Sequence, residues 1–493
     1  MSCGNHYTRM FPELARAPST PNSLVEQGLI ALGEGMLDNP KDRPKETPFA
    51  GYTYFGQFID HDLTFDVTPL RLAGKNSVED TPNFRSARLD LDQVYGGGPT
   101  ISPFLYRRDS PRGAERFLIG VTSPTLVGGH TFEASPNDLP RNSQGVALTS
   151  DPREDENLII AQLHVAFLKL HNLVLEWLEQ KKLKSPFPAG ATLFEQARRL
   201  VTWHYQWVAR HDFLQEILDP GVFKQLSDDT PKNGRKEQRE FAIPVEFSMA
   251  AFRFGHSMVR DEYFVNEKHD GAELKELLFL TGANGGACPS LPADWVIDWQ
   301  RFFFIGAGRD SARASRAIDT GIALGLHGLS TNVIRLFSAA LGSTAGSADE
   351  TSDLPVRTLV RGARVGLPIG QDVANALCVP SPLIDTEIAQ GPHQKILELY
   401  GLHRETPLWY YILKEAELRN NGEKLGWLGS TIVASVITAA LQSDGDSYLS
   451  VDPKWVPTLP GPRNPEMFGM GHLLRFVIDH SWPPPDPALV LET

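Results

Sequence analysis

The sequence predicts a mainly α-helical protein with little β-structure. Apolar side chains recur every three or four residues in five long segments, as they do in amphipathic helices, and few stretches alternate as strands do. Gly- and Pro-rich connections run between these segments, and the longest, at 73–115 and 341–375, exceed simple turns, so we expect some to carry function. The predicted helical segments are residues 155–182, 193–217, 244–259, 394–420 and 429–442.

Proline-rich segments stand at both ends of the chain. The first contains RAPSTPNS and NPKDRPKETP, and the last reads SWPPPDPALVLET. Such composition is typical of irregular chain rather than of helices. We therefore expect an N-terminal arm wrapped on the surface (residues 1–49), one large helical domain with long irregular loops (residues 50–480) and a C-terminal tail (residues 481–493).

Composition narrows the possible partners. The chain has 493 residues, 41% of them hydrophobic, which is enough for a large core. Its formal net charge of -13 argues against nucleic-acid or anionic-membrane partners. The start of the sequence lacks signal-peptide features, and no run approaches about 18 uninterrupted apolar residues, so we expect a cytoplasmic protein without a transmembrane segment. Three cysteines without CxxC spacing suggest no disulfide framework.

The stretch FGQFIDHDLTFD, residues 55–66, places three ionisable residues inside an apolar run. In a helix, successive side chains point about 100° apart, so Asp60, His61 and Asp62 face three directions. A buried carboxylate needs a cation, a metal ion or a covalent bond as its partner. A solvated polar edge is the simpler alternative.

Two further motifs offer catalytic chemistry. In SDPREDEN, Arg153 and Glu156 are three residues apart at the start of a long apolar helix, although acidic residues there also serve as helix caps. In FRFGHSM, Gly255 precedes His256 and opens space beside the imidazole for a flat ligand.

A fourth motif, SARLDLDQVYGGG, offers ligands for a metal ion. Asp90 and Asp92 present hard oxygen atoms on a loop that could bend around calcium, and Asp62 could add a third carboxylate. His164 and His171, seven residues apart on one helical face, are expected to be ordinary hydrogen-bonded core histidines.

In order and spacing these motifs resemble those of the animal-type haem peroxidases of the peroxidase-cyclooxygenase superfamily. The signature consists of GQFIDHD, LDLDQVYG, DPREDE with HVAFLKLHN, FRFGH and VRGARVGLP, spread over roughly residues 50–370. The resemblance implies a single large helical haem peroxidase domain that holds haem b and calcium. It also implies that hydrogen peroxide is reduced through an oxo-ferryl intermediate and that small organic or (pseudo)halide donors are oxidised.

The resemblance assigns roles to residues on both sides of the haem. His61 matches the distal histidine that transfers the peroxide proton, Arg153 the distal arginine that stabilises developing negative charge, and Gln57 the distal glutamine. His256 matches the proximal iron ligand, and Arg253 matches the arginine on the propionate side.

The same resemblance implies two kinds of attachment. Asp60 and Glu156 match carboxylates that form ester bonds to haem methyl groups. Calcium would fix the helix that carries His61. Its implied ligands are Asp62, Ser86, the backbone carbonyl of Arg88, Asp90 and Asp92.

Three residues depart from the family pattern. Asn157 follows Glu156 where some members carry a methionine linked to haem, so we expect easier oxidation of iodide, thiocyanate, bromide or organic donors than of chloride. Thr358 replaces the usual asparagine beside the proximal imidazole, which affects the expected iron chemistry. Asp92 replaces a serine or threonine and should tighten calcium binding.

Two other functions stay open. A fatty-acid dioxygenase of the cyclooxygenase branch needs a tyrosine three residues before the proximal histidine, where this chain has Arg253. A catalytically impaired haem- and calcium-binding protein would need only His256, so the presence of His61 and Arg153 argues against it, while Thr358 keeps it open. The sequence does not reveal the donor, the pathway, whether haem is covalently attached or the oligomeric state.

Overall fold

The described residues separate into two compact units, each assembled from three segments of the chain. Unit 1 contains residues up to 88, 213–261 and 314–453, and unit 2 contains 89–212, 262–313 and those from 454 onward. Each unit is described by itself. The computed structural model describes residues 6–38, 47–75, 77–107, 115–183, 191–228, 241–282, 289–305, 312–329 and 351–481.

Unit 1 is helical. Its α-helices are α1 (Leu24–Gly35), α2 (Ala50–Leu63), α7 (Leu214–Ile217), α8 (Pro220–Asp228), α9 (Val245–Ser248), α10 (Gly255–Met258), α13 (Leu354–Val365), α14 (Gly370–Ala376), α15 (Asp385–Ile388), α16 (Gln394–Leu399), α17 (Leu408–Asn420), α18 (Trp427–Ser443) and α19 (Tyr448–Val451). The short 3-10 helices are η1 (Pro12–Leu14), η2 (Leu70–Leu72), η7 (Ala251–Phe254) and η11 (Leu324–Leu326).

Helix α17 lies at the centre of this unit. It packs against α13, α14, α18 and η7, and its side chains are buried from Leu408 to Ala416. Helix α2 packs against α10. A helix that is apolar on most of its circumference is stable only inside a protein, so α17 and α2 form the core around which the shorter helices are arranged.

The N-terminal segment differs from the predicted surface arm. Residues 24–35 form α1, which packs against α13, and Tyr7 and Phe11 are buried. The carboxylate of Glu246 accepts hydrogen bonds from the backbone N–H groups of Met10 (2.9 Å) and Phe11 (3.2 Å). The apolar residues between the prolines therefore draw this segment into the core of unit 1.

Helix α13 and the start of α14 fall within the predicted irregular connection 341–375, and that expectation was wrong for residues 354–365 and 370–375. The Asp353 side chain caps the helix by accepting a hydrogen bond from Val356 N (2.8 Å), and Pro355 stands in the first turn. The helix ends at Gly366, whose φ of 75° is left-handed. Residues 341–350 lie outside the described part of the chain.

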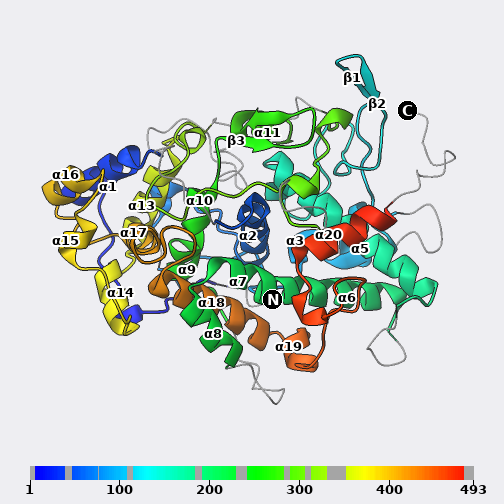
Figure 1. Ribbon diagram of the computed structural model, residues 1–493. Coiled ribbons are helices and arrows are strands. Elements are labelled where there is room, and N and C mark those ends of the chain that lie inside the picture. Colours follow the sequence, from blue (N-terminus) through cyan, green and yellow to red (C-terminus); the bar gives the residue numbers. More distant parts are fainter. Residues whose placement is uncertain are drawn as a thin grey trace. The chain divides into compact units, whose positions relative to one another are not determined.

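Unit 2 is built around the long helix α5 (Leu158–Glu179), which packs against α6 (Leu193–Trp207) and α20 (Met470–His480), as Figure 1 shows. The remaining helices are α3 (Asp92–Tyr95), α4 (Gly98–Ile101), α11 (Leu274–Phe279), η3 (Pro103–Leu105), η5 (Pro152–Asp155), η9 (Ala293–Trp295), η10 (Trp299–Arg301) and η12 (Pro465–Met467), together with the π-helical turn η6 (Val208–Phe213), which runs into unit 1.

The described strands form two antiparallel hairpins in unit 2. β1 (Thr125–Val127) pairs with β2 (His130–Phe132), and β3 (Glu262–Phe264) pairs with β4 (Asp270–Glu273) with an irregular register. Gly128 and Gly129 join β1 to β2 with φ angles of 59° and 81°. Two consecutive positive φ angles are what a tight two-residue hairpin requires, and glycine adopts them without strain.

The mainly α fold with little β-structure is confirmed, and the helix boundaries differ in part. Segment 155–182 is one helix, α5, and segment 429–442 lies within α18. Segment 193–217 is interrupted by η6, and 394–420 is split before α17 at Pro407, its N-cap residue. Segment 244–259 is not one helix but α9, η7 and α10. Of the predicted C-terminal tail, only Ser481 is described.

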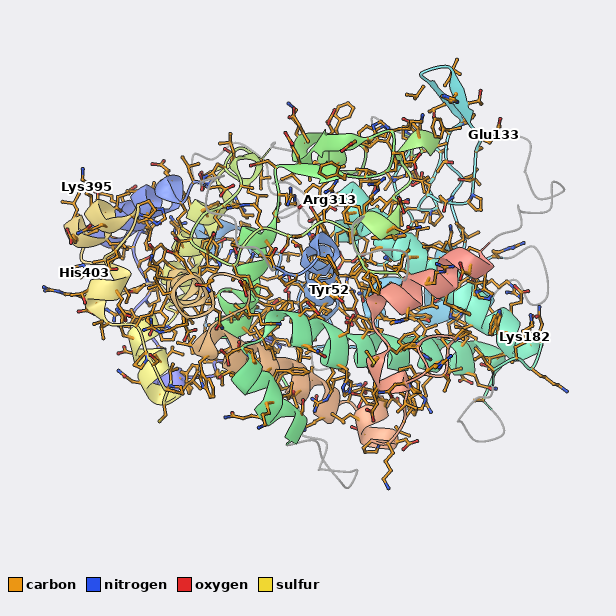
Figure 2. The ribbon with its side chains drawn as sticks, viewed as in Figure 1. Tyr52, Glu133, Lys182, Arg313, Lys395 and His403 are labelled. Atoms are coloured by element: carbon orange, nitrogen blue, oxygen red, sulfur yellow. The ribbon has the colours of Figure 1, made fainter. Side chains whose placement is uncertain are left out.

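Among the described helices, only α5 is long and apolar enough to cross a membrane. Its most apolar window is 89% buried, as expected for the core helix of a globular unit, so this is weak support for a membrane span. Figure 2 shows the contrast between interior and surface in unit 1: Tyr52 of α2 is only 7% exposed and lies among packed side chains, whereas Lys395 of α16 projects outward.

Candidate active site

Helix α2 presents the predicted distal residues in unit 1. His61 is 3% exposed and Asp62 is fully buried, while Gln57 and Asp60 are half-buried. Gln57 lies three residues before Asp60 and four before His61, so it neighbours each of them on the helix surface, whereas Asp60 and His61 point about 100° apart. Gly56 lies so close to the ring of Phe213 that an added Cβ would stand 3.1 Å from it. The packing of α2 is thus tight behind the polar side.

Asp60 is held at the end of α2 and lies near Arg253. The hydroxyl of Thr64 donates to Asp60 Oδ1 at 2.9 Å. Burial lowers the pKa of the Arg253 guanidinium, and the negative charges of Asp60 and Asp66 oppose that effect. Asp60 is therefore an electrostatic partner of Arg253, and its carboxylate is oriented by its own helix.

His256 has the properties of a ligand for iron. Burial lowers the pKa of its imidazole to about 3, and the charge of Arg253 adds to the effect, so the ring is neutral at ordinary pH. Its Nδ1 atom is buried and has no hydrogen-bond partner among the described residues. An added Cβ on Gly255 would meet no atom within 4 Å. A neutral imidazole beside open space is what a haem group would need here.

Trp409 of α17 fixes this histidine, and sequence reasoning missed it. Its indole N–H donates to the carbonyl of Arg253 at 3.1 Å, and its ring meets the His256 ring edge to face, with centroids 5.9 Å apart. Trp409 lies far along the chain from His256, within a run of consecutive buried residues. No local pattern distinguishes it from an ordinary core tryptophan.

Thr358 is buried in α13 and bonded within its own helix. Its hydroxyl donates to the carbonyl of Leu354 at 2.9 Å. The single hydroxyl hydrogen is used there, so toward an imidazole N–H Thr358 could act only as an acceptor. Because His256 Nδ1 has no partner in the described part of the chain, the bond expected from the family's asparagine is not made.

Arg361, one turn after Thr358, is a second residue that the sequence did not single out. Its guanidinium donates to Asp66 Oδ2 (3.1 Å) and to the carbonyl of Thr68 (3.0 Å). Its positive charge lowers the pKa of Arg253. Arg361, Asp66 and Thr68 line a small pocket of unit 1, and Val245 and Met249 also line it.

The predicted calcium ligands are divided between the units. In unit 1, Ser86 Oγ accepts a hydrogen bond from Arg88 N at 3.3 Å. In unit 2, Asp90 Oδ1 accepts one from Asp92 N at 3.2 Å, and the carbonyl of Asp92 accepts one from the Ser150 hydroxyl at 3.1 Å. The Asp90–Asp92 loop is thereby tied to the segment that leads to Arg153.

Unit 2 also carries Arg153 and Glu156, both buried. The Arg153 guanidinium pairs with the carboxylate of Asp151, with Nη2 2.7 Å and Nε 3.1 Å from its oxygens. The carboxylate also accepts the backbone N–H of Arg153 at 2.9 Å. The sequence analysis did not single out Asp151. Its position just before Pro152 at the start of a helix is typical of an N-cap residue, and this was the available signal.

Comparison with known families agrees with these features. The sequence model described as "Animal haem peroxidase" matches residues 70–281. Over this segment, which is less than half of the chain, the sequence is similar to animal haem peroxidases. The matched segment includes Arg153, Glu156 and His256. His61 lies just before it and is supported by the motif alone.

Individual relatives within this superfamily are distant. The chain is 24% identical to peroxidasin of Drosophila melanogaster over 359 residues, which is 70% of this chain and 21% of the relative. It is 28% identical to thyroid peroxidase of Mus musculus over 185 residues, 35% of this chain and 19% of the relative. The chain thus spans about a fifth of the length of these curated relatives.

Solved structures show the same haem peroxidase-cyclooxygenase fold. Peroxidase A from Dictyostelium discoideum superposes with a TM-score of 0.58 at 15% identity and covers 90% of this chain and 88% of its own. The fatty acid alpha-dioxygenase of Oryza sativa superposes with a TM-score of 0.59 at 13% identity, with 87% and 76% covered. At such identities the likeness establishes the fold alone.

Proposed function

We propose that the protein is a haem-dependent peroxidase that reduces hydrogen peroxide and oxidises a small donor. The proposal rests mainly on His256, a neutral, half-buried imidazole in contact with Trp409 and next to the open space at Gly255. The match of residues 70–281 to the animal haem peroxidase model and the ordered motifs around His61 and Arg153 support the same activity.

The residues present fit a haem group. His256 would hold the iron through its imidazole, and Arg253, with a buried guanidinium one turn earlier, would bind the carboxylates at the haem edge. Bound haem would supply the iron centre at which the peroxide O–O bond is broken. The protein contributes the geometry and the charges around that centre.

The distal residues would manage the protons and the charge of peroxide. His61 would accept the proton of one peroxide oxygen at an imidazole nitrogen and return it to the departing oxygen. Arg153, whose guanidinium is oriented by Asp151, would stabilise the negative charge on that departing oxygen. Gln57, on the same side of α2 as His61, would hydrogen-bond water or a small anionic donor.

This mechanism predicts large effects of two substitutions. His61→Ala and Arg153→Ala should each slow the reaction with peroxide by about 10²-fold or more, because each removes a group that acts on the O–O bond. Haem should stay bound in both variants. Stopped-flow absorbance of the haem-reconstituted proteins measures the rate; a variant that reacts as fast as the unchanged protein would overturn the role assigned to that residue.

Two finer features are part of the proposal. One is calcium binding by the ligands that the family resemblance implies, and the hydrogen bonds accepted by Ser86 Oγ and Asp90 Oδ1 within 86–92 support a loop that is already bent. Calorimetric titration of the calcium-stripped protein tests it. Ester bonds from Asp60 and Glu156 to haem are tested by acid-acetone extraction, which would leave esterified haem on the protein.

A fatty-acid dioxygenase is the alternative, and the likeness to the Oryza sativa enzyme favours considering it. Arg253 stands where the radical tyrosine of the cyclooxygenase branch would be, and its guanidinium Nε is bound to the carbonyl of Ser248 at 3.0 Å. Arginine cannot form that radical. Oxygen consumption on addition of a fatty acid to the haem-loaded protein would favour the dioxygenase, and peroxide-dependent oxidation of guaiacol or iodide would favour the peroxidase.

A further inference from the structure

Four consecutive ionisable residues are buried at the junction of η5 and α5. Arg153, Glu154, Asp155 and Glu156 are all less than 9% exposed. Burying a charged group is costly unless a partner compensates it. The two residues in the middle have no role in the proposed mechanism, so their partners are informative.

Glu154 is bound to a histidine of the helix that follows. Its Oε2 atom lies 3.1 Å from Nδ1 of His164, and the two side chains are 0% and 2% exposed. His164 belongs to α5, which begins at Leu158, so this contact joins η5 to a rigid helix. The sequence predicted that His164 is an ordinary hydrogen-bonded core histidine. The hydrogen bond is confirmed, and its partner, Glu154, lies in the segment that carries Arg153 and Glu156.

Asp155 is anchored on another side. The guanidinium of Arg141 binds its two carboxylate oxygens at 2.7 and 2.9 Å, and the backbone N–H of Gly282 donates to it at 3.0 Å. The segment that carries Arg153 and Glu156 is therefore held by its two intervening carboxylates. The bidentate Arg141 guanidinium is a rigid anchor for Asp155, and the bond between Glu154 and His164 ties the same segment to α5.

We propose that His164 is a positioning residue that fixes Arg153 and Glu156 through Glu154, which rests on the proposed function of those two residues. The imidazole donates to a fully buried carboxylate. Loss of the donor removes a buried bond between η5 and α5, so the backbone at Glu154 and at the neighbouring Arg153 is held less firmly. Residues that orient a catalytic group from behind typically alter activity by about 10- to 100-fold when removed.

The test compares two histidines of one helix. His164→Leu removes the donor, while His164→Asn keeps a nitrogen donor close to the position of Nδ1. His171→Leu is the matched control: His171 is also buried in α5 and is bound to the Tyr95 hydroxyl (3.0 Å) and the carbonyl of Glu115 (2.9 Å), seven residues farther from η5. Both leucine variants lose a buried hydrogen-bonded imidazole.

Two readouts are measured for each variant. Hydrogen-deuterium exchange of residues 151–157 in the haem-free protein reports the order of the segment, and the peroxide rate constant of the haem-loaded protein reports its effect. We expect His164→Leu to exchange faster in this segment and to react about 10- to 100-fold more slowly. His164→Asn should recover most of both, and His171→Leu should resemble the unchanged protein in both. Equal effects of the two leucine variants, or none at His164, would overturn the proposal.

A double-mutant cycle keeps the test decisive if one variant folds poorly. Glu154→Ala should act through the same hydrogen bond, so Glu154→Ala combined with His164→Leu should be no slower than the slower single variant. Additive losses would contradict the proposal. If the unchanged haem-loaded protein does not react with peroxide, the proposed function fails, whereas the exchange comparison still decides whether His164 orders residues 151–157.

Discussion

At the scale of single residues, the surroundings of His256 decide what it can bind. The ring is neutral because burial lowers its pKa to about 3. The Trp409 ring packs edge to face with it, and the Trp409 indole N–H donates to the carbonyl of Arg253. A histidine that stays neutral at ordinary pH keeps a lone pair for a metal. The surroundings of His256 differ from the family pattern at Thr358, where the hydroxyl is bound to Leu354.

This difference predicts that Thr358 has little influence on the haem. Thr358→Val keeps the shape of the side chain and removes a hydroxyl that is bound within α13, so the haem absorption spectrum and reduction potential should stay unchanged. Thr358→Asn supplies the comparison, since it restores the residue that the family pattern has at this position. A clear shift of the potential in Thr358→Val would mean that the hydroxyl serves the imidazole after all.

Sequence reasoning succeeds for residues whose chemistry is local. Gly255 beside His256 indicated open space next to the ring, and an added Cβ there would indeed meet no atom within 4 Å. It fails for Trp409, because the contact joins segments more than a hundred residues apart and nothing near Trp409 in the sequence records it. Asp151 lies between these cases, since its capping position was readable but its bond to the Arg153 guanidinium was not.

At the scale of elements, α1 and α13 show how the N-terminal segment supports the site in unit 1. Arg364 of α13 donates from Nε to Glu26 Oε1 of α1 at 2.8 Å and from Nη1 to the carbonyl of Leu70 at 3.1 Å. Glu26 and Arg364 are 2% and 7% exposed. Helix α13 also carries Thr358 and Arg361, so this ion pair holds the element that lies behind the pocket at Asp66.

Breaking this pair should be costly. Glu26→Ala leaves a buried guanidinium without its carboxylate, which we expect to lower the free energy of unfolding by about 3–5 kcal/mol. Glu405→Ala is the control, since Glu405 binds Arg16 at 2.9 Å but the two side chains are 60% and 39% exposed; its loss should cost about 1 kcal/mol or less. Urea unfolding measures both. Equal, small effects would show that α1 does not brace α13.

The predictability of elements follows the strength of local signals. Helix α5 has a long apolar periodicity and was predicted almost to its ends. The capping aspartate, first-turn proline and terminal glycine of α13 were present in the sequence, but the surrounding glycines and prolines made the whole connection look irregular. No proline or glycine at Met249 or Ala250 marks the break between α9 and η7 in the sequence. The break is imposed by packing against α17 and α18.

At the scale of the whole molecule, buried histidines make stability depend on pH. His204 is fully buried: its Nδ1–H donates to the carbonyl of Leu200 at 2.7 Å, and its Nε2 accepts the N–H groups of Thr458 (3.0 Å) and Leu459 (3.1 Å). This arrangement requires the neutral ring, and burial lowers its pKa to about 4. The pKa of His171 is also lowered to about 4, and that of His211 to about 3.

The sign of the effect follows from these pKa values. The unfolded chain takes up a proton on each such histidine below about pH 6.5, whereas the folded chain does so only near pH 4 or below, so their contribution to stability is present above pH 6.5 and is lost as the pH falls toward 4. Asp319 and Glu415, whose pKa values burial raises to about 7, act in the opposite direction in the same range.

A single variant separates the histidine contribution. His204→Gln removes one such group, so between pH 7 and pH 5 its free energy of unfolding should fall by about 2 kcal/mol less than that of the unchanged protein, at about 1.4 kcal/mol per pH unit below 6.5. Urea titrations of both proteins at pH 7, 6 and 5 measure the difference. Parallel pH profiles would mean that His204 is not held neutral.

Haem binding through His256 is tested by titrating the haem-free protein with haem. Haem is added to the haem-free protein and to His256→Ala while the Soret absorbance is followed, with His171→Ala as a buried-histidine control. We predict saturation at one haem per chain for the unchanged protein and for His171→Ala, and at least a 100-fold weaker affinity for His256→Ala, because only His256 would supply the iron ligand. Equal haem binding by His256→Ala, or no specific binding by the unchanged protein, would contradict the account.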